Sequence, residues 1–516
     1  MNETTWQQWA ITITTFLPIA GAIVVMLVPS SKDKMIRGLG VVTTALAFLC
    51  SIAIAIGFDY DRSAELQFVK NVDWIPVIGA RYHVGIDGIS LPLFVLTFLL
   101  GLLCAIYTAR YVPQPGRTKA FVALTLLLLT GMAGTFISFD LILFFVFWEL
   151  VLVPMYFLIG VWGSANRRYA SIKFFLYTLF GSVFMLLGFL AIYYTAVDPA
   201  TGQHTFDLQA IITYANTTGF SHNFQLIVFG AIALGFAVKV PMWPFHTWLP
   251  DAHTEAPTIG SVLLAGIMLK MGTYGFVRIA LPALPDGAVA YAPWIGALAA
   301  IAIVYAALAC LAQKDLKRLI AFSSVGHMGF VMLGIATLTT IGIQAAIFGM
   351  VAHGVITGML FFCVGSIYDR YHTREIAEIG GGMSELMPKM AGIFAFVAIA
   401  SLGLPGLAGF IGEFMALLSS FSPAAVLNVG LYRTFMVVGG IGTILTAGYF
   451  LWMLQRVNQG EAPVKWREHH FRDILAVEWV SWVPLLALTL VLGLVPGIIL
   501  NPTLHGAEAV VHLVTG

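Results

Sequence analysis

The chain has 516 residues, of which 59% are hydrophobic and only 10% are charged. A soluble protein of ordinary composition has about a quarter of its residues charged, so we expect this chain to be embedded in lipid. Its formal net charge of +1 indicates neither a nucleic-acid partner nor an acidic one.

Apolar runs recur along the whole chain. A helix needs about 20 apolar residues to cross a bilayer core. The first run, MNETTWQQWAITITTFLPIAGAIVVMLVP, lacks the basic start and small-residue cleavage site of a signal peptide, so we interpret it as a membrane helix. We predict an all-α polytopic membrane protein with about 14 transmembrane helices, near residues 8–29, 37–57, 88–110, 119–138, 139–162, 168–195, 224–250, 257–281, 289–312, 318–338, 341–368, 388–420, 432–456 and 478–500.

Basic residues lie mainly in alternate loops. They follow the first, third, fifth, ninth, eleventh and thirteenth spans, whereas the loops after the sixth, eighth and tenth contain no Lys or Arg. Because positive loops face the cytoplasm, both termini are predicted outside it. The loop at 58–87 has mixed charge and some strand-like alternation. Without a transit-peptide pattern, we expect a multi-pass protein of a bacterial inner (plasma) membrane, or an organelle-encoded one.

Two of the predicted spans are interrupted. The span at 224–250 contains three prolines in VKVPMWPFHTWLP, and the span at 388–420 contains one proline among several glycines in LGLPGLAGFIG. Proline removes a backbone donor and glycine loosens a helix. Irregular backbone at membrane depth is tolerated only where protein buries it or where it lines a wet cavity. Broken helices at matching positions of two halves indicate an ion site.

The two breaks occupy equivalent places. Each lies in the fourth helix of a five-helix block, helices 4–8 and helices 9–13, and the blocks begin about 170 residues apart. Because five is odd, the second block must cross the membrane in the opposite sense, which predicts two inverted repeats with helices 7 and 12 discontinuous. The predicted divisions are N-terminal helices 1–3 in 1–115, the first repeat in 116–285, the second in 286–457, and a cytoplasmic loop with helix 14 in 458–516.

Six ionisable residues inside the apolar runs are the candidate site: Glu149, Lys239, Lys270, His327, His353 and Glu413. A charge at the centre of a membrane helix is costly, so such groups persist when they are paired, hydrated or used. A lysine that pairs with a carboxylate and then separates from it can hold and release a proton. Histidine titrates near neutrality and suits a relay. The alternatives are a static salt bridge between Glu149 and Lys239, and histidines that only join helices.

Other motifs carry little chemistry. The segment HTWLPDAHTEAPT has no recognised metal spacing and is interpreted as a wetted cytoplasmic entry or a polar turn. The four cysteines lie in separate apolar runs without a CxxC or Cys–His pattern, so no metal site is expected. The triplet at 380–382 follows no strand and is not a nucleotide fingerprint.

The same segments carry a family likeness. FWELVLVPMYFLIGVWG, FAVKVPMWPFHTWLPDAHTEAPTIGSVLLAGIMLKMGTYG, KRLIAFSSVGHMGF and LGLPGLAGFIGEF resemble the signature stretches of the antiporter-like subunits of respiratory complex I, over about residues 85–460. The M type is the most similar, because it carries glutamate at the position of Glu413 where the L and N types carry lysine. The lack of a long C-terminal lateral helix also argues against the L type.

The resemblance implies roles for the six residues. Glu149 and Lys239 match the coupling pair, Lys270 the lysine that links the half-channels, and Glu413 the terminal group of the second half-channel. His327 and His353 match the polar axis between them.

The resemblance also implies an activity: a non-redox, proton-translocating subunit of NADH-quinone oxidoreductase. NADH, FMN, iron–sulfur clusters and quinone are expected in partner subunits and no cofactor in this chain. The implied partners are other membrane subunits, including L-type and N-type chains, and the lipid bilayer. Multisubunit cation/proton antiporters and membrane-bound hydrogenases use similar subunits, so the ion and the complex stay open, and a scaffold with silent charges is a third alternative.

Overall fold

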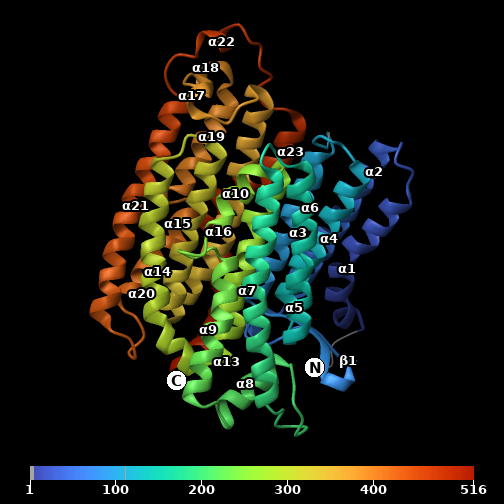
Figure 1. Cartoon of the computed structure of the whole chain (residues 1–516), viewed down its shortest axis with the longest axis vertical. Helices are drawn as coiled ribbons and strands as arrows, with labels where there is room; N and C mark the ends of the chain where they lie inside the picture. Colours follow the sequence, from blue (N-terminus) through green and yellow to red (C-terminus); the bar gives the residue numbers. More distant parts are fainter. Residues whose placement is uncertain (1–4, 111) are drawn as a thin grey trace.

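The computed structural model describes residues 5–110 and 112–516. Within these ranges thirteen helices are long and apolar enough to cross a membrane. Two shorter apolar helices, α19 (Pro388–Ser401) and α20 (Ala408–Phe421), are the halves of the span predicted at 388–420. Together they account for the predicted number of crossings, and the protein is an all-α polytopic bundle (Figure 1).

The first part of the chain contributes three long helices and a hairpin. Its elements are α1 (Thr5–Leu27), α2 (Asp33–Gly57), η1 (Tyr60–Arg62), β1 (Gln67–Ile75), η2 (Pro76–Ile78), β2 (Ala80–Ile86) and α3 (Ser90–Thr108). The two strands are antiparallel, with Lys70 opposite Val84 and Asp73 opposite Arg81. The strand-like alternation predicted for the loop at 58–87 is therefore confirmed.

The middle of the chain is helical almost throughout. Its elements are α4 (Thr118–Ile137), α5 (Leu141–Leu150), α6 (Leu152–Trp162), α7 (Arg167–Thr195), α8 (Leu208–Thr217), α9 (His222–Lys239), α10 (Trp248–Glu255), α11 (Thr258–Leu263), η3 (Leu264–Met268), α12 (Leu269–Gly275), η4 (Phe276–Ala280) and α13 (Leu281–Ala283). The predicted break in the span at 224–250 is present, because α9 ends at Lys239 and α10 begins only at Trp248.

The last part of the chain forms the other flank of the bundle. Its elements are α14 (Pro285–Leu311), α15 (Leu316–Ala336), α16 (Thr340–Tyr371), α17 (Ile376–Ile379), α18 (Met383–Leu386), α19, α20, α21 (Val429–Val457), α22 (Val464–Arg467), α23 (Ala476–Leu494) and α24 (Gly497–Thr515). The beginning of α1 and the end of α24 lie at the same end of the bundle as the hairpin, opposite α17, α18 and α22 (Figure 1).

Two irregularities lie outside the predictions. The span at 139–162 is divided at Val151, between α5 and α6, two residues after Glu149. The span at 257–281 contains two π-helical turns, η3 and η4. In η3 the N–H of Leu269 bonds to the carbonyl of Leu264, five residues back, rather than to that of Ala265. The Ala265 carbonyl is thereby released for another donor.

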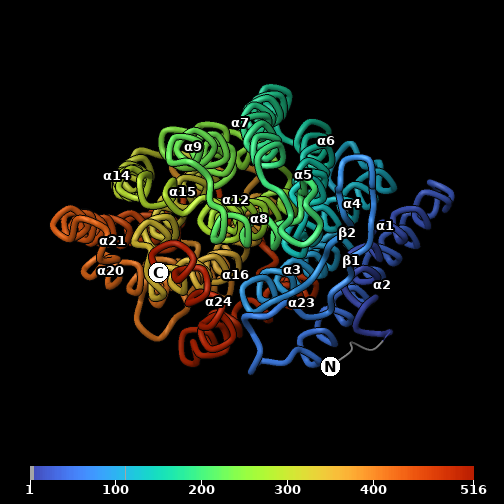
Figure 2. The backbone as a smooth tube through the Cα atoms, turned by 90° about the horizontal axis from the view of Figure 1, so that it is seen from below, coloured from blue at the N-terminus to red at the C-terminus, as the bar shows by residue number. Residues whose placement is uncertain are grey.

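The long helix α16 is the centre of the molecule, with the other helices around it when the bundle is seen from below (Figure 2). Its most apolar window is 94% buried. Close packing against η3 depends on small residues, because a Cβ atom on Gly354 would lie 2.8 Å from the Gly266 carbonyl oxygen and 2.8 Å from a Leu96 methyl carbon. This approach brings the charged residues of the two helices together.

Replacing Gly354 with alanine should loosen this packing. The added methyl group meets backbone, which cannot rotate away, and overpacking of this kind costs about 1–3 kcal/mol. We expect Gly354→Ala to lower the thermal unfolding midpoint of the detergent-purified protein. Gly392→Ala is the matched control, since a Cβ atom there has nothing within 4 Å. Equal midpoints for the two variants would contradict the tight approach.

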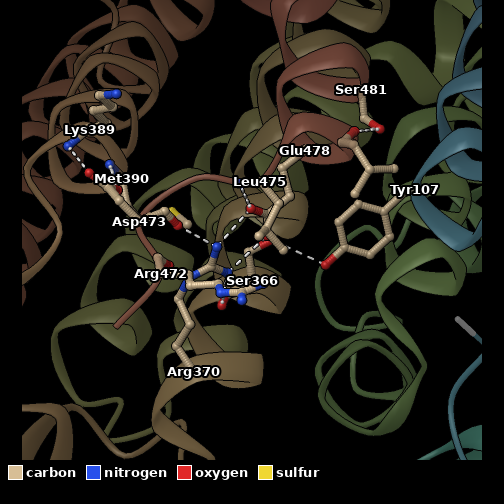
Figure 3. Close-up of polar contacts among 11 residues, drawn as sticks. Tyr107, Ser366, Arg370, Lys389, Met390, Arg472, Asp473, Leu475, Glu478 and Ser481 are labelled. Carbon is tan, nitrogen blue, oxygen red and sulfur yellow. Dashed lines mark hydrogen bonds and ion pairs between the residues drawn. The ribbon is translucent and has the colours of Figure 1, made fainter. Parts of the chain in front are cut away.

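A second packing constraint joins α16 to the last part of the chain (Figure 3). The Arg370 guanidinium contacts both carboxylate oxygens of Glu478, at 2.9 and 2.7 Å, and also donates to the backbone carbonyls of Arg472, Asp473 and Ser366. The two side chains are 8% and 2% exposed. Glu478 also accepts a hydrogen bond from the Leu475 N–H and so caps α23. The ion pair therefore holds α23 against α16.

Breaking this pair should be expensive. Arg370→Gln leaves the Glu478 charge buried without a cation, a change that typically costs about 3–5 kcal/mol. We expect a large fall in the thermal midpoint. Arg467→Gln is the control, because its pair with Glu461 is 48% and 87% exposed and such surface pairs contribute about 0–1 kcal/mol. A small, equal effect of both changes would show that the Arg370 pair has no special weight.

Candidate functional site

Lys270 and His353 are in direct contact at the centre of the bundle. The Lys270 ammonium group is fully buried, lies 2.6 Å from His353 Nδ1 and donates to the Ala265 carbonyl that η3 releases. The π-turn thus supplies an acceptor that a regular helix would have used for its own N–H. The local backbone is what allows a lysine to lie this deep.

His327 and Glu413 form a second pair. His327 Nδ1 lies 2.7 Å from Glu413 Oε1, and its Nε2 lies 3.0 Å from the Ser401 hydroxyl. Ser401 is the last residue of α19 and Glu413 lies in the first half of α20, so both sides of the helix break hold the imidazole. The predicted association of Glu413 with a broken helix therefore has a definite partner.

A small cavity connects the two pairs. The rings of His327 and His353 are 5.7 Å apart, centre to centre. Both line a cavity of about 30 Å³ together with Thr357, Ser401 and Glu413. His353 Nε2, Thr357 Oγ1 and Glu413 Oε2 are buried and have no hydrogen-bond partner among the described residues. A cavity of this size fits one or two water molecules, which need two to four polar partners, so these atoms are suited to hold them.

Glu149 and Lys239 form the first part of the predicted axis, but they are not in contact. Among the described side chains no ion pair within 4.0 Å joins them, although their charges interact electrostatically. The Lys239 ammonium group instead lies 5.0 Å above the centre of the Trp148 ring, where a cation–π interaction stabilises it. The Trp148 indole N–H donates to the Ser182 hydroxyl at 2.9 Å, and that hydroxyl donates to the Thr178 carbonyl at 3.0 Å, so both hold the Trp148 ring beside Lys239. A static Glu149–Lys239 salt bridge is therefore absent from this conformation.

The six predicted residues thus lie in two groups. Lys270, His353, His327 and Glu413 are linked directly or through the small cavity, whereas Glu149 and Lys239 form a separate group at the junctions of α5 with α6 and of α9 with the segment 240–247. No hydrogen bond between the two groups is found among the described residues.

Two further titratable residues are buried near the site but are not among the six predicted residues. Lys317 falls between the predicted spans 289–312 and 318–338, but it is buried and its ammonium group donates to the Ala256 carbonyl at 2.5 Å. His253 is fully buried against Phe361, and neither ring nitrogen has a partner among the described residues. A sequence signal existed for Lys317: Ser324 is seven residues later, on the same face of a helix that continues into the apolar run.

The sequence of this chain is similar to that of a known protein family. The family "NADH:quinone oxidoreductase/Mrp antiporter, TM" matches residues 138–442, which include all six residues. NADH-quinone oxidoreductase subunit M of Rickettsia bellii is 44% identical over 95% of this chain and 96% of its own. The chain belongs to this family.

Solved structures agree. A chain of respiratory complex I from Thermus thermophilus has a TM-score of 0.86 and 28% identity, with 98% of this chain and 100% of that chain covered. A chain of the Mrp complex from Dietzia sp. has a TM-score of 0.83 at 20% identity, over 99% and 100% of the two chains, and shows a shared fold alone. The predicted resemblance to M-type antiporter-like subunits is confirmed.

The contacts make one energetic prediction. If Lys270 and His353 interact directly, the stability losses of Lys270→Met and His353→Leu should not add, with a coupling of about 0.5–3 kcal/mol. Lys239→Met combined with His353→Leu is the control cycle, because those side chains do not touch and should be additive. Thermal midpoints of the purified single and double variants test this. Additivity in both cycles would contradict the 2.6 Å contact.

Proposed function

We propose that this chain is a proton-translocating membrane subunit of an NADH-quinone oxidoreductase, complex I. The observation that carries the proposal is the buried line Lys270–His353–His327–Glu413, whose members are spaced for proton transfer directly or through one or two waters. Each member can bind and release a proton, and none is committed to an ion pair with an arginine. The similarity to chains of that name supports the choice of complex.

In this proposal Glu149 and Lys239 act as the coupling pair. The separated arrangement seen here is one state, in which Trp148 holds the ammonium group. When the carboxylate approaches, it stabilises the charge on Lys239, and when it leaves, the proton becomes easier to release. A proton entering at the cytoplasmic side of the broken α9–α10 helix would pass to Lys270 and along the axis to Glu413, beside the break between α19 and α20.

The chain works as a non-redox part of a larger enzyme. Moving one charge against 100 mV costs about 2.3 kcal/mol, and we propose that electron transfer from NADH to quinone in partner subunits supplies it. The FMN and iron–sulfur clusters belong to those partners. We further propose that L-type and N-type antiporter-like chains are neighbours in a bacterial inner membrane, with both termini of this chain outside the cytoplasm.

The alternative is a subunit of a cation/proton antiporter or a membrane-bound hydrogenase. The shared fold with a chain of the Mrp complex keeps this alternative in view. The partners decide between them: co-purification with flavin and iron–sulfur proteins favours complex I, and sodium-dependent growth rescue without a redox partner favours the antiporter.

Removing the carboxylate of the coupling pair tests the proposal. We expect Glu149→Ala and Lys239→Ala to abolish NADH-driven proton uptake by inverted membrane vesicles while the complex assembles almost normally. Glu385→Gln is the control, since that glutamate is exposed and far from the axis in sequence. Full pumping by an assembled Glu149→Ala complex would rule out the coupling role.

A further inference from the structure

The hairpin end of the bundle, predicted to lie outside the cytoplasm, contains a large polar cavity. It measures about 510 Å³ and lies between the β1–β2 hairpin and the segment 198–210. His83 and Asp207 line it and are 2.5 Å apart, from His83 Nδ1 to Asp207 Oδ2. Burial opposes ionisation of Asp207, but its hydrogen bonds with His83 and with backbone N–H groups hold its pKa below the ordinary value. His83 is therefore a buried imidazole on the wall of a polar cavity, paired with a carboxylate.

A layer of packed aromatic and charged side chains leads from the wall of this cavity toward Lys270. The His83 ring lies 6.0 Å from the Phe139 ring. The guanidinium of Arg278, which belongs to η4, lies 5.0 Å from the centre of the same Phe139 ring. Arg278 follows Lys270 by eight residues, or roughly 12 Å along a helix. Tyr274 lies between Lys270 and Arg278 in the sequence, about one helical turn from each, and it is fully buried. A leak of protons from the cavity to Lys270 would have to cross this layer.

The charged and hydroxyl side chains of this layer bind one another and the backbone. Two atoms of the Asp87 carboxylate bind Arg278 Nη2, at 2.5 and 2.6 Å. That carboxylate also accepts the N–H groups of Ile89 and Ser90. Tyr274 receives the Arg278 Nε–H at 3.2 Å and donates its own hydroxyl proton to the Phe136 carbonyl at 2.8 Å. The ion pair is buried, because the side chain of Arg278 is 11% exposed and that of Asp87 is 3% exposed.

These properties suit a barrier and not a relay. A guanidinium does not lose its proton in proteins, and a fixed arginine is one device by which membrane pores exclude protons. The Phe136, Phe139 and Tyr274 rings fill the remaining space with apolar surface. Arg278 carries no special signal in the sequence, because it lies near the end of an apolar run, where a cation can ordinarily reach the membrane surface.

We propose that Arg278, fixed by Asp87, closes the first repeat toward the hairpin-side cavity, so that a proton on Lys270 leaves sideways through His353. The proposal rests on the function proposed above. It assigns to Arg278 and Asp87 a positioning and sealing role that lies outside the six-residue axis. It also explains how the polar cavity lined by His83 and Asp207 can lie in the same repeat as Lys270 without letting protons leak across the membrane.

The test uses the complete complex in sealed vesicles and needs no NADH. An imposed pH gradient should decay several-fold faster when Arg278→Gln is combined with Asp87→Asn, a pair of changes that removes both charges and leaves no buried carboxylate unpaired. Arg278→His is the second variant, because it can still pair with Asp87 but can lose its proton, and it should leak as well. Arg81→Gln is the matched control, since that exposed arginine lines the same cavity without lying in the layer.

A further change separates sealing from general loosening. Adding Lys270→Met to the leaking double variant should restore tightness, because the leak is expected to run through Lys270, whereas a disordered bundle would stay leaky. Assembled variants that hold the gradient like the unmodified complex would overturn the proposal, and so would a leak that Lys270→Met leaves unchanged. If Glu149→Ala pumps normally while Arg278→His leaks, the proposed function fails and the barrier stands.

Discussion

A buried ammonium group needs hydrogen-bond acceptors, and in this bundle the backbone supplies them. Lys270 uses the carbonyl of Ala265, which is free only because the Leu269 N–H bonds one residue further back. Lys317 uses the carbonyl of Ala256, at the end of the short helix α10. Without such acceptors a lysine at this depth would be neutral or absent, since unsatisfied polar groups in lipid are costly. Helix irregularity is thus a condition for the charges.

The same constraint orders the packing. The neighbouring helix α16 packs closely against the π-turn η3 itself, and Gly266 and Gly354 allow that approach because neither has a side chain. His353, next to Gly354, is thereby placed against Lys270. On the other flank the gap between α19 and α20 puts Ser401 and Glu413 on two sides of His327. Backbone geometry therefore determines which charges meet.

Sequence reasoning located the proline and glycine breaks and all six interior charges, because both have local signals. The divided span after Glu149 and the two π-turns have no such signal. Nothing in LLAGIMLK distinguishes a π-turn from an α-turn, and only the structure shows that the Ala265 carbonyl is free to accept from Lys270. The separation of Glu149 from Lys239 could not be predicted either, because the Trp148 ring comes to lie under the Lys239 ammonium group, and is held there by Ser182, only once α5, α7 and α9 are packed. The burial of Lys317 was not predicted, because basic residues near the start of a helix are usually solvated. The inverted relation of the two repeats stays a prediction.

If protons pass along the proposed axis, the small cavity beside His327 and His353 makes that step depend on very few water molecules. A connection of only one or two water molecules would pass protons only when it is complete. Without that water the imidazole rings of His327 and His353 are isolated from each other. Residues as small as Ala345 and Ala352 line that space, so a single extra methyl group has the dimensions of the whole connection. In the proposed mechanism, proton conduction would then follow the occupancy of this small cavity, and the slow step would be the arrival of a water molecule and not the movement of a proton.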